Sequence, residues 1–223
     1  MEGGEGIIQL RWYTLQKESQ ASIGVGSLII FIAMILVAGI TASVLIQTMN
    51  SLEQQALKTG METIREISSG LKVTHISGYQ HNATISQLAI FITPVTGSEA
   101  IDLTYTHISI SDSKKQAILN YSKTCFSRNV TNGLFNTLNA SRLSASTFGI
   151  VVIRDIDGSC NASLPIINQE DLVVLLINTS KCFSGLGTRI KVQGSINPEF
   201  GIAGLIEFTT PNTYLKNIVE LWP

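Results

Sequence analysis

The stretch Leu28-Ile-Ile-Phe-Ile-Ala-Met-Ile-Leu-Val37 decides the fold, because it lies inside a segment from Ser19 to Leu52 that carries no charged side chain. A bilayer core of about 30 Å requires about 20 apolar residues in a helix, and Ile23 to Ile46 supplies that length. We therefore predict a helix that can cross a membrane. A buried core helix of a soluble protein is the alternative interpretation.

The helix is predicted to continue beyond the apolar segment. Apolar residues recur at spacings of four and three in the next stretch, at Leu57, Met61, Ile64 and Ile67, which is typical of an amphipathic helix. Ser68-Ser-Gly70 is a suitable end. The sequence thus predicts a single helix of about 45 residues, about 65 Å long, within residues 22–70.

A polar segment, residues 1–21, precedes this helix. Its charged residues are scattered among Gly and Gln without a clear period, and it has the character of a segment to be removed. An ordinary secretory signal is the alternative, with its cut after an apolar region of 7 to 15 residues, near Thr41-Ala42-Ser43. The apolar run here is much longer than that.

From Leu71 onward the pattern changes to short alternating or β-branched runs separated by turn residues, so residues 71–223 predict a β-sandwich or barrel and the fold class is α+β. The expected strands are 71–76, 87–93, 101–110, 149–154, 171–177, 188–193, 202–208 and 217–221. Residues 118–147 are expected to form loop and short helix. Asp157-Gly158 is expected to be the turn of a hairpin that joins 151–153 to 159–160.

Asn-x-Ser/Thr sequons are dense in the part of the chain that follows the helix. They begin at Asn82, Asn120, Asn129, Asn139, Asn161 and Asn178. Chance accounts for two or three sequons in such a sequence, whereas six on one side of a membrane segment indicate an exported and glycosylated surface. We therefore expect the C-terminal side of the helix to lie outside the cell.

Composition and motifs argue against nucleic-acid binding and catalysis. The net charge is −1 with 14% charged residues, and no basic block occurs. The three histidines, His75, His81 and His107, stand in no known catalytic motif. We therefore predict no enzyme activity and no cofactor.

No metal site is predicted either. Asp155 and Asp157 resemble the start of a calcium loop, but its later ligands are missing, so a turn is the expected structure. Glu170 and Asp171 would point to opposite faces of a strand.

Three cysteines, Cys125, Cys160 and Cys182, lie far apart with no CxxC spacing. One disulfide with a thiol left over, or three thiols buried as small apolar residues, are both compatible with the sequence.

Two overlapping small-xxx-small pairs lie in the apolar helix, Ala38 with Ala42 and Gly39 with Ser43. Such pairs allow helices to approach closely, which favours association with other copies of the helix. Ordinary use of small residues in a membrane span is the other interpretation.

Five stretches resemble archaeal flagellins (archaellins), which are relatives of type IV pilins. They are Gly24-Val-Gly-Ser-Leu-Ile-Ile-Phe-Ile-Ala-Met-Ile-Leu-Val-Ala38, Ala42-Ser-Val-Leu-Ile46, Gly97-Ser-Glu-Ala-Ile-Asp-Leu103, Phe148-Gly-Ile-Val-Val-Ile-Arg-Asp155 and Pro198-Glu-Phe-Gly-Ile-Ala-Gly-Leu-Ile-Glu-Phe-Thr-Thr-Pro211. The resemblance covers nearly the whole chain. Bacterial type IV pilins carry Glu at the fifth mature residue, where this chain would have Gly26.

The resemblance implies a filament subunit for swimming, made as a membrane precursor with a class III signal peptide. Placing the family's Gly-x-Gly on Gly24 and Gly26 puts the cut between Ala21 and Ser22, on the cytoplasmic side, by a prepilin-peptidase-like protease. The family usually has basic residues before the cut, where this chain has Glu18-Ser-Gln20.

The resemblance further implies an assembly platform, helices packed in the core of an extracellular filament, immunoglobulin-like β-sandwiches in its wall, and copolymerisation with paralogous flagellins. Two other functions stay open at this point. An archaeal adhesion pilin would share the leader, the helix and the export route. A single-pass membrane-anchored binding ectodomain would stay uncut and monomeric.

Overall fold

The computed structural model describes residues 5–222, and it describes side chains within the N-terminal helix from Ile23 onward. The chain divides into two compact units, one ending at Gly60 and the other beginning at Met61. The N-terminal unit is helical throughout its described part. The second unit holds the end of the helix and all the strands.

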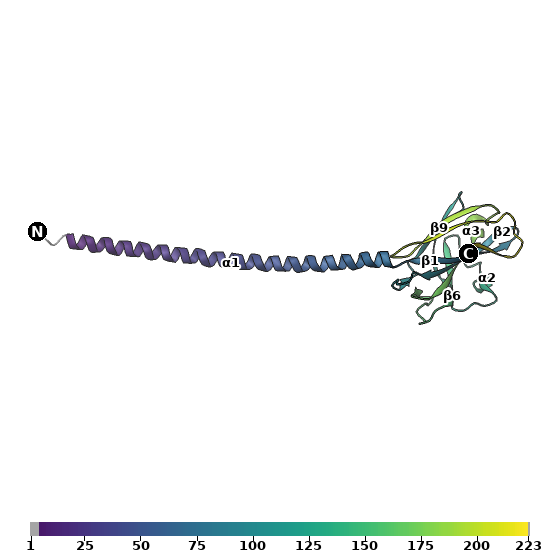
Figure 1. Ribbon diagram of the computed structural model, residues 1–223, viewed down its shortest axis with the longest axis horizontal. Helices are drawn as coiled ribbons and strands as arrows, with labels where there is room; N and C mark the ends of the chain where they lie inside the picture. The colour runs from purple at the N-terminus through teal and green to yellow at the C-terminus, as the bar shows by residue number, and fades with distance from the viewer. Residues whose placement is uncertain (1–4, 223) are drawn as a thin grey trace. The chain divides into compact units, whose positions relative to one another are not determined.

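Helix α1 spans Glu5–Ser68 without interruption (Figure 1). The apolar part, which is long enough to cross a membrane, and the amphipathic part that follows it form one continuous helix, as the spacing of the apolar residues predicted. The helix begins earlier than expected, inside the predicted leader, because residues 7–22 contain neither Gly nor Pro to break it. It ends at Ser68, and Gly70 follows within two residues.

The domain that follows is built mainly of strands. Their bounds are β1 (Leu71–His81), β2 (Thr84–Pro94), β3 (Ile101–Asp102), β4 (His107–Ser111), β5 (Gln116–Ser127), β6 (Thr147–Arg154), β7 (Ile166–Ile167), β8 (Leu172–Ile177), β9 (Lys191–Asn197), β10 (Gly204–Thr209) and β11 (Ile218–Trp222). Two short helices are α2 (Leu134–Thr137) and α3 (Thr179–Phe183). The predicted helix followed by a β-rich domain is confirmed.

Nine of these strands form one sheet in the order β10-β9-β4-β5-β6-β8-β2-β1-β11, and β3 pairs with β7 apart from it. Every pairing in the large sheet is antiparallel except that of β5 with β6, which is parallel. The sheet curves until β10 comes to lie near β1, and side chains from both ends of the sheet enter one core. The curved sheet thus surrounds one main apolar core, to which strands from both of its ends contribute.

Strands β2, β6 and β8 in the middle of the sheet are buried on both faces. Residues Val173 to Ile177 are all buried, and a second apolar cluster covers the face of these strands that points away from the main core. Phe135, Leu138 and Leu143 from the segment around α2 supply that cover. The apolar run in β8 is continuous because each face of the strand packs against an apolar cluster.

Two sequence predictions in this domain are wrong. Residues 118–127 were expected to be loop but belong to β5, where only Leu119 and Cys125 are buried, so that the alternation in the sequence is weak. Asp157-Gly158 does not turn a hairpin, because β6 pairs with β5 and β8 and not with residues 159–160, of which Cys160 forms a bridge to Pro165.

Candidate functional site

The candidate site is the surface of helix α1, which is both apolar and exposed. Every described side chain from Ile23 to Ser68 is exposed, and the large apolar ones among them are between 49% and 71% exposed. The most apolar 18-residue window has a mean hydropathy of 2.8, and its length and composition suffice to cross a membrane. An apolar patch of this extent is not stable in water, so another apolar surface has to cover it.

Three hydroxyl groups in the apolar part of the helix bond to the helix itself. Ser27 donates to the carbonyl of Gly24 at 2.9 Å, Thr41 to that of Val37 at 2.8 Å, and Thr48 to that of Leu45 at 2.8 Å. These three side chains therefore offer no unpaired donor to the surroundings. Lipid tails or a second apolar helix can cover them without an unsatisfied hydrogen bond.

The predicted helix–helix packing residues Ala38, Gly39, Ala42 and Ser43 all lie in α1 and are exposed. A side chain added at Gly39 would meet nothing within 4 Å. Within the described part of the helix, the surface at Gly39 is therefore open to close packing by another helix. The predicted cleavage residues Ala21 and Ser22 also fall in α1, and their side chains lie outside the described part.

The end of α1 is joined to the β-domain by a short set of backbone bonds, which we call the neck. The amide of Ile202 donates to the carbonyl of Ser69 at 2.8 Å, and the amide of Leu71 donates to the carbonyl of Ile202 at 3.0 Å. Gly70 and Ile202 thereby form a parallel bridge. Both Ser69 and Gly70 are buried, so these bonds are shielded from water.

Side chains around the neck add a second layer of contacts. The Arg65 guanidinium lies over the ring of Phe200, 3.6 Å from its centroid, and its Nε is 2.8 Å from a Glu99 carboxylate oxygen. The amide of Glu99 also donates to Ser69 Oγ at 3.2 Å. Arg65 and Glu99 are about half exposed, so the ion pair contributes little to stability, and the buried backbone bonds hold the neck.

Five of the six sequon asparagines are exposed, namely Asn82, Asn120, Asn129, Asn139 and Asn161. Asn82 lies at the tip of the β1–β2 hairpin, in a two-residue turn whose residues Asn82 and Ala83 have φ of 52° and 58°. Such an asparagine is open to a modifying enzyme.

Asn178 differs from the other five because it is buried, with 7% of its surface exposed. It is the N-cap of α3, where its Oδ1 accepts from the amide of Lys181 at 3.2 Å. Its Nδ2 donates to the carbonyl of Ala140 at 2.9 Å. The nitrogen that a glycan would occupy is therefore engaged inside the fold.

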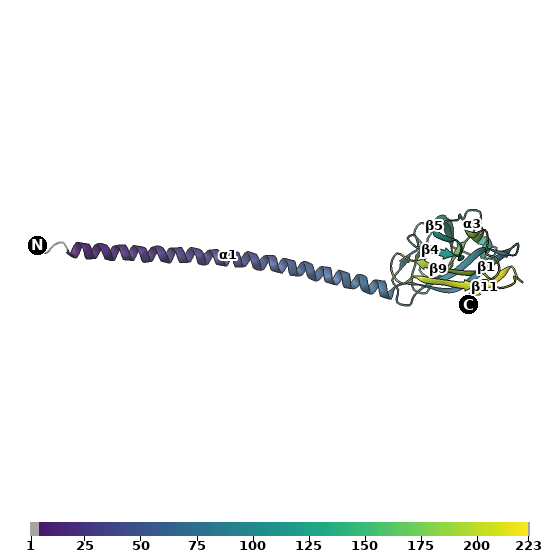
Figure 2. The ribbon, with the colours of Figure 1, turned by 90° about the horizontal axis from the view of Figure 1, so that it is seen from above.

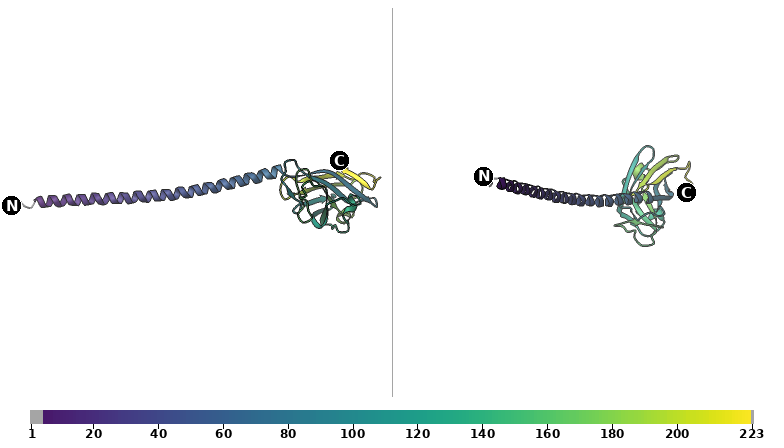
Figure 3. Two further views of the ribbon diagram at one scale, coloured as in Figure 1. Left: turned by 90° about the horizontal axis from the view of Figure 1, so that it is seen from below. Right: turned by 60° about the vertical axis from the view of Figure 1, so that its left-hand side comes forward.

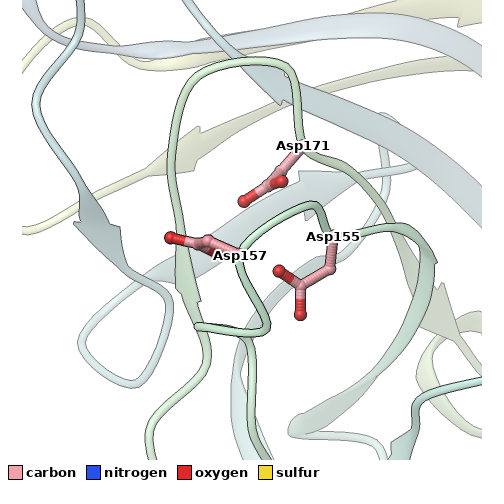
Figure 4. Close-up of side chains that lie close together, drawn as sticks. All are labelled: Asp155, Asp157 and Asp171. Carbon is pink, nitrogen blue, oxygen red and sulfur yellow. The ribbon is translucent and has the colours of Figure 1, made fainter.

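The carboxylates of Asp155, Asp157 and Asp171 lie together, with oxygen atoms within 4.8 Å of one another (Figure 4). This cluster was not predicted from the sequence. Asp155 and Asp157 come from the loop after β6, and Asp171 from the residue before β8. Oxygen ligands of this kind suit a hard cation such as Ca²⁺. Asp171 was interpreted only as a neighbour of Glu170, because the approach of two loops cannot be seen along one chain.

The loop also satisfies these carboxylates internally. Asp155 accepts from the amide of Gly158 at 2.8 Å, and Asp171 accepts from the amide of Asn168 at 2.9 Å. Burial raises the pKa of Asp171, while hydrogen bonds from Ser159 lower that of Asp157. Residues 155–159 are thus a loop held by Asp side chains and not the hairpin turn predicted for Asp157-Gly158.

The three cysteines are free thiols. Cys125 and Cys160 are buried and Cys182 is partly buried, and burial raises the pKa of Cys160 to about 12 and that of Cys182 to about 11. Thiols held protonated in this way are unreactive. Of the two interpretations left open by the sequence, the structure agrees with apolar packing.

A family model described as archaeal-type flagellin matches residues 21–208, which include the apolar helix and most of the β-domain. The chain belongs to the archaeal-type flagellin family. Flagellin B2 of Methanocaldococcus jannaschii is 45% identical to it over 216 residues, covering 95% of this chain and 100% of that protein. Flagellin B4 of Pyrococcus abyssi is 39% identical, covering 91% of this chain and 98% of that protein.

Two solved structures are similar to this flagellin. The crystal structure of archaeal flagellin FlaB1 from Methanocaldococcus jannaschii has a TM-score of 0.63 at 34% identity, covering 69% of this chain and 96% of that chain. The archaeal flagellum of Methanospirillum hungatei strain JF1 has a TM-score of 0.62 at 16% identity, covering 89% and 98%. The second likeness is one of fold.

The sequence missed two features of the site. The neck includes Phe200, Gly201 and Ile202, which lie in the Pro198–Pro211 stretch that served only to identify the family. A Phe-Gly pair in a loop was a usable signal, because Gly is needed where the backbone takes positive φ. The Asp171 contribution to the carboxylate cluster left no signal in the sequence.

Proposed function

We propose that the chain is a subunit of the archaeal flagellar filament that polymerises through α1, which would lie in the filament core. Family membership makes it a structural protein rather than an enzyme. The observation that supports the role of α1 is its exposure, because the large apolar side chains described from Ile23 to Ile67 are all exposed and require an apolar cover. Copies of the same helix provide one.

The precursor is proposed to sit in the cell membrane through the same helix. Lipid covers the apolar side chains before assembly and identical helices cover them afterwards, so the helix exchanges one apolar environment for another. Because this exchange removes little apolar surface from water, close packing at Gly39 and its small neighbours supplies the attraction between helices. A repeated heterologous contact of this kind gives an open filament.

The N-terminal 21 residues are proposed to be removed before assembly, with the cut between Ala21 and Ser22 made by a prepilin-peptidase-like protease. Gly24 and Gly26 stand at the positions of the family's Gly-x-Gly, and an added Cβ would meet nothing within 4 Å at either position. An assembly platform then takes up the mature subunit, alone or with paralogous flagellins.

Mass spectrometry of filaments sheared from the native cells tests processing and assembly together. We expect subunits whose N-terminal residue is Ser22, in material that electron microscopy shows as filaments. An intact leader, or a cut near Ala42, would contradict the proposed processing. The chain in the membrane fraction but absent from sheared filaments would support an anchored ectodomain instead.

The same preparation tests which sequons carry glycans. We expect added mass on the peptide with Asn82, and none on the peptide with Asn178, whose Nδ2 is bonded inside the fold. Asn178→Gln is expected to destabilise the β-domain by about 1 to 3 kcal/mol, since it removes an N-cap and leaves the partly buried carbonyl of Ala140 without its bond from Asn178.

Asn82→Gln is the matched control for that substitution. It removes a sequon at an exposed turn, and we expect it to shift the subunit mass without an unfolding change of the size seen for Asn178→Gln. A glycan found on Asn178, or equal destabilisation by both substitutions, would contradict this assignment. Chemical denaturation of detergent-solubilised subunits gives the comparison.

A further inference from the structure

Helix α1 carries a line of uncharged polar side chains within its exposed apolar surface. Figures 2 and 3 show α1 as one continuous helix, so residues spaced alternately by four and three share one face of it. One such line of exposed residues runs through Ile29, Ala33, Leu36, Ile40, Ser43, Gln47, Asn50, Gln54 and Leu57. We call its four consecutive polar residues the polar seam: Ser43, Gln47, Asn50 and Gln54.

The line is apolar on both sides of the polar seam. Leu36 and Ile40 precede the seam and Leu57 follows it, and these three side chains are between 61% and 66% exposed. Exposed apolar side chains of this size along one helix face require an apolar cover. A surface that covers both Ile40 and Leu57, about 25 Å apart along the helix, also passes over the polar residues between them.

The neighbouring line of the helix, one residue further along the chain, has a different character. It also contains polar residues, Thr48 and Gln55, but its next position is the charged Lys58, whereas the line of the polar seam returns to Leu57. Charged residues mark the side of a helix that faces water. The polar seam therefore interrupts an apolar line rather than forming the start of a charged one.

The amides of the seam have no partner in their own helix. Thr41 and Thr48 return their hydroxyls to carbonyls of α1, but the side-chain amides of Gln47, Asn50 and Gln54 make no hydrogen bond to any residue that the structure describes. These three residues follow Ile46, the end of the apolar segment, so in the membrane precursor water at the bilayer surface can solvate them. Packing against another helix removes that water, and each amide then needs a new partner.

We propose that the polar seam bonds to the polar seam of α1 in a second copy of the chain, and that these bonds fix the axial register of the helices in the filament. This inference rests on the proposed function, in which α1 packs against copies of itself. An amide both donates and accepts, so the amide of another copy satisfies it.

Register follows from the apolar residues on either side of the seam. Sliding one helix along the other by several turns would place the amides against Ile40 or Leu57, which cannot bond to them. In coiled coils, a polar residue within an apolar seam specifies register in this way, at a cost in stability.

Replacing two seam amides by leucine tests the proposal in the full chain, expressed in a host that lacks its own flagellins. We expect Gln47→Leu/Gln54→Leu to form filaments whose electron micrographs lose the sharp layer lines of the wild-type filament, because an apolar seam associates without selecting one register. We also expect these filaments to dissociate at a higher temperature than wild-type filaments, since the polar residues lower the stability of the seam.

Thr48→Leu/Gln55→Leu is the matched control. It adds two leucines at the same spacing of seven residues on the neighbouring line, and it leaves every amide of the polar seam in place. We expect its filaments to keep sharp layer lines. Gln47→Asn/Gln54→Asn retains an amide at both seam positions, and we expect it to keep sharp layer lines as well.

Sharp layer lines from Gln47→Leu/Gln54→Leu, or equal loss of order from both leucine variants, would overturn the proposal. Loss of order from the asparagine variant would overturn it too, because the amides would then not be what sets the register. Absence of filaments from Gln47→Leu/Gln54→Leu would also count against it, since the amides are assigned control of register and not of association. Absence of filaments from the wild-type chain in the same host would instead contradict the proposed function.

Discussion

Leu36→Glu is expected to abolish filament formation completely. Leu36 lies in the centre of the apolar part of α1 and is 61% exposed in the single chain, so in a filament core it would face copies of the same helix. A charged residue at the centre of a membrane helix costs about 2.5 to 3.5 kcal/mol on insertion scales. In a filament this cost recurs in every subunit, and each buried carboxylate lacks a partner.

Leu36→Met is the matched control, because it preserves the volume and apolar character of the side chain and such exchanges cost less than about 1.5 kcal/mol. Electron microscopy of sheared material and a swimming assay read out both variants. Since α1 up to Gly60 is a unit separate from the β-domain, the fold of that domain should not change. Normal filaments from Leu36→Glu would exclude α1 from the filament core.

The helix was predictable because its signal is local. Charge is absent from Ser19 to Leu52, and the spacing of Leu57, Met61, Ile64 and Ile67 continues the helix beyond the apolar part. Both features depend only on neighbours along the chain, and the observed end at Ser68 agrees with them. Strands such as β8 were predictable for the same reason, since five consecutive apolar residues are buried on two faces.

The features that the sequence did not disclose depend on contacts between distant segments. β5 is recognised by its neighbours β4 and β6 rather than by its own weak alternation. Asn178 has the same sequon as Asn82, and only the fold shows that its amide is bonded to Ala140. A sequence pattern gives the chemistry that is possible at a site, whereas burial decides whether that chemistry is accessible.

The neck is a further example, and it leads to the second large effect. Gly201 has φ of +92°, a conformation that other residues adopt only with strain, and a Cβ built there would lie 3.0 Å or less from Ser69 O, Ser69 C and Gly70 N. Those atoms are backbone and cannot move without breaking the bond from Ile202 to Ser69. Only glycine fits the chain at this point.

Gly201→Ala is therefore expected to destabilise the β-domain by about 2 to 4 kcal/mol, which combines backbone strain with loss of the buried neck bonds. In a domain of this size that change lowers Tm by about 5 to 15 °C. Thermal unfolding of the detergent-solubilised subunit measures it. The expected consequence for the filament is a weakened connection between the assembly helix and the β-domain in every subunit.

Gly133→Ala separates the two contributions to that effect. Gly133 has φ of +86°, close to that of Gly201, but an added Cβ would meet nothing within 4 Å. We expect it to show only the cost of its own positive-φ backbone, where ψ is 156°, about 1 to 3 kcal/mol. Equal unfolding temperatures for the two alanine variants would mean that the contact with Ser69 contributes nothing. A larger loss at Gly201 would show that the Phe-Gly-Ile sequence at 200–202 is maintained by the close approach of two backbones at the neck.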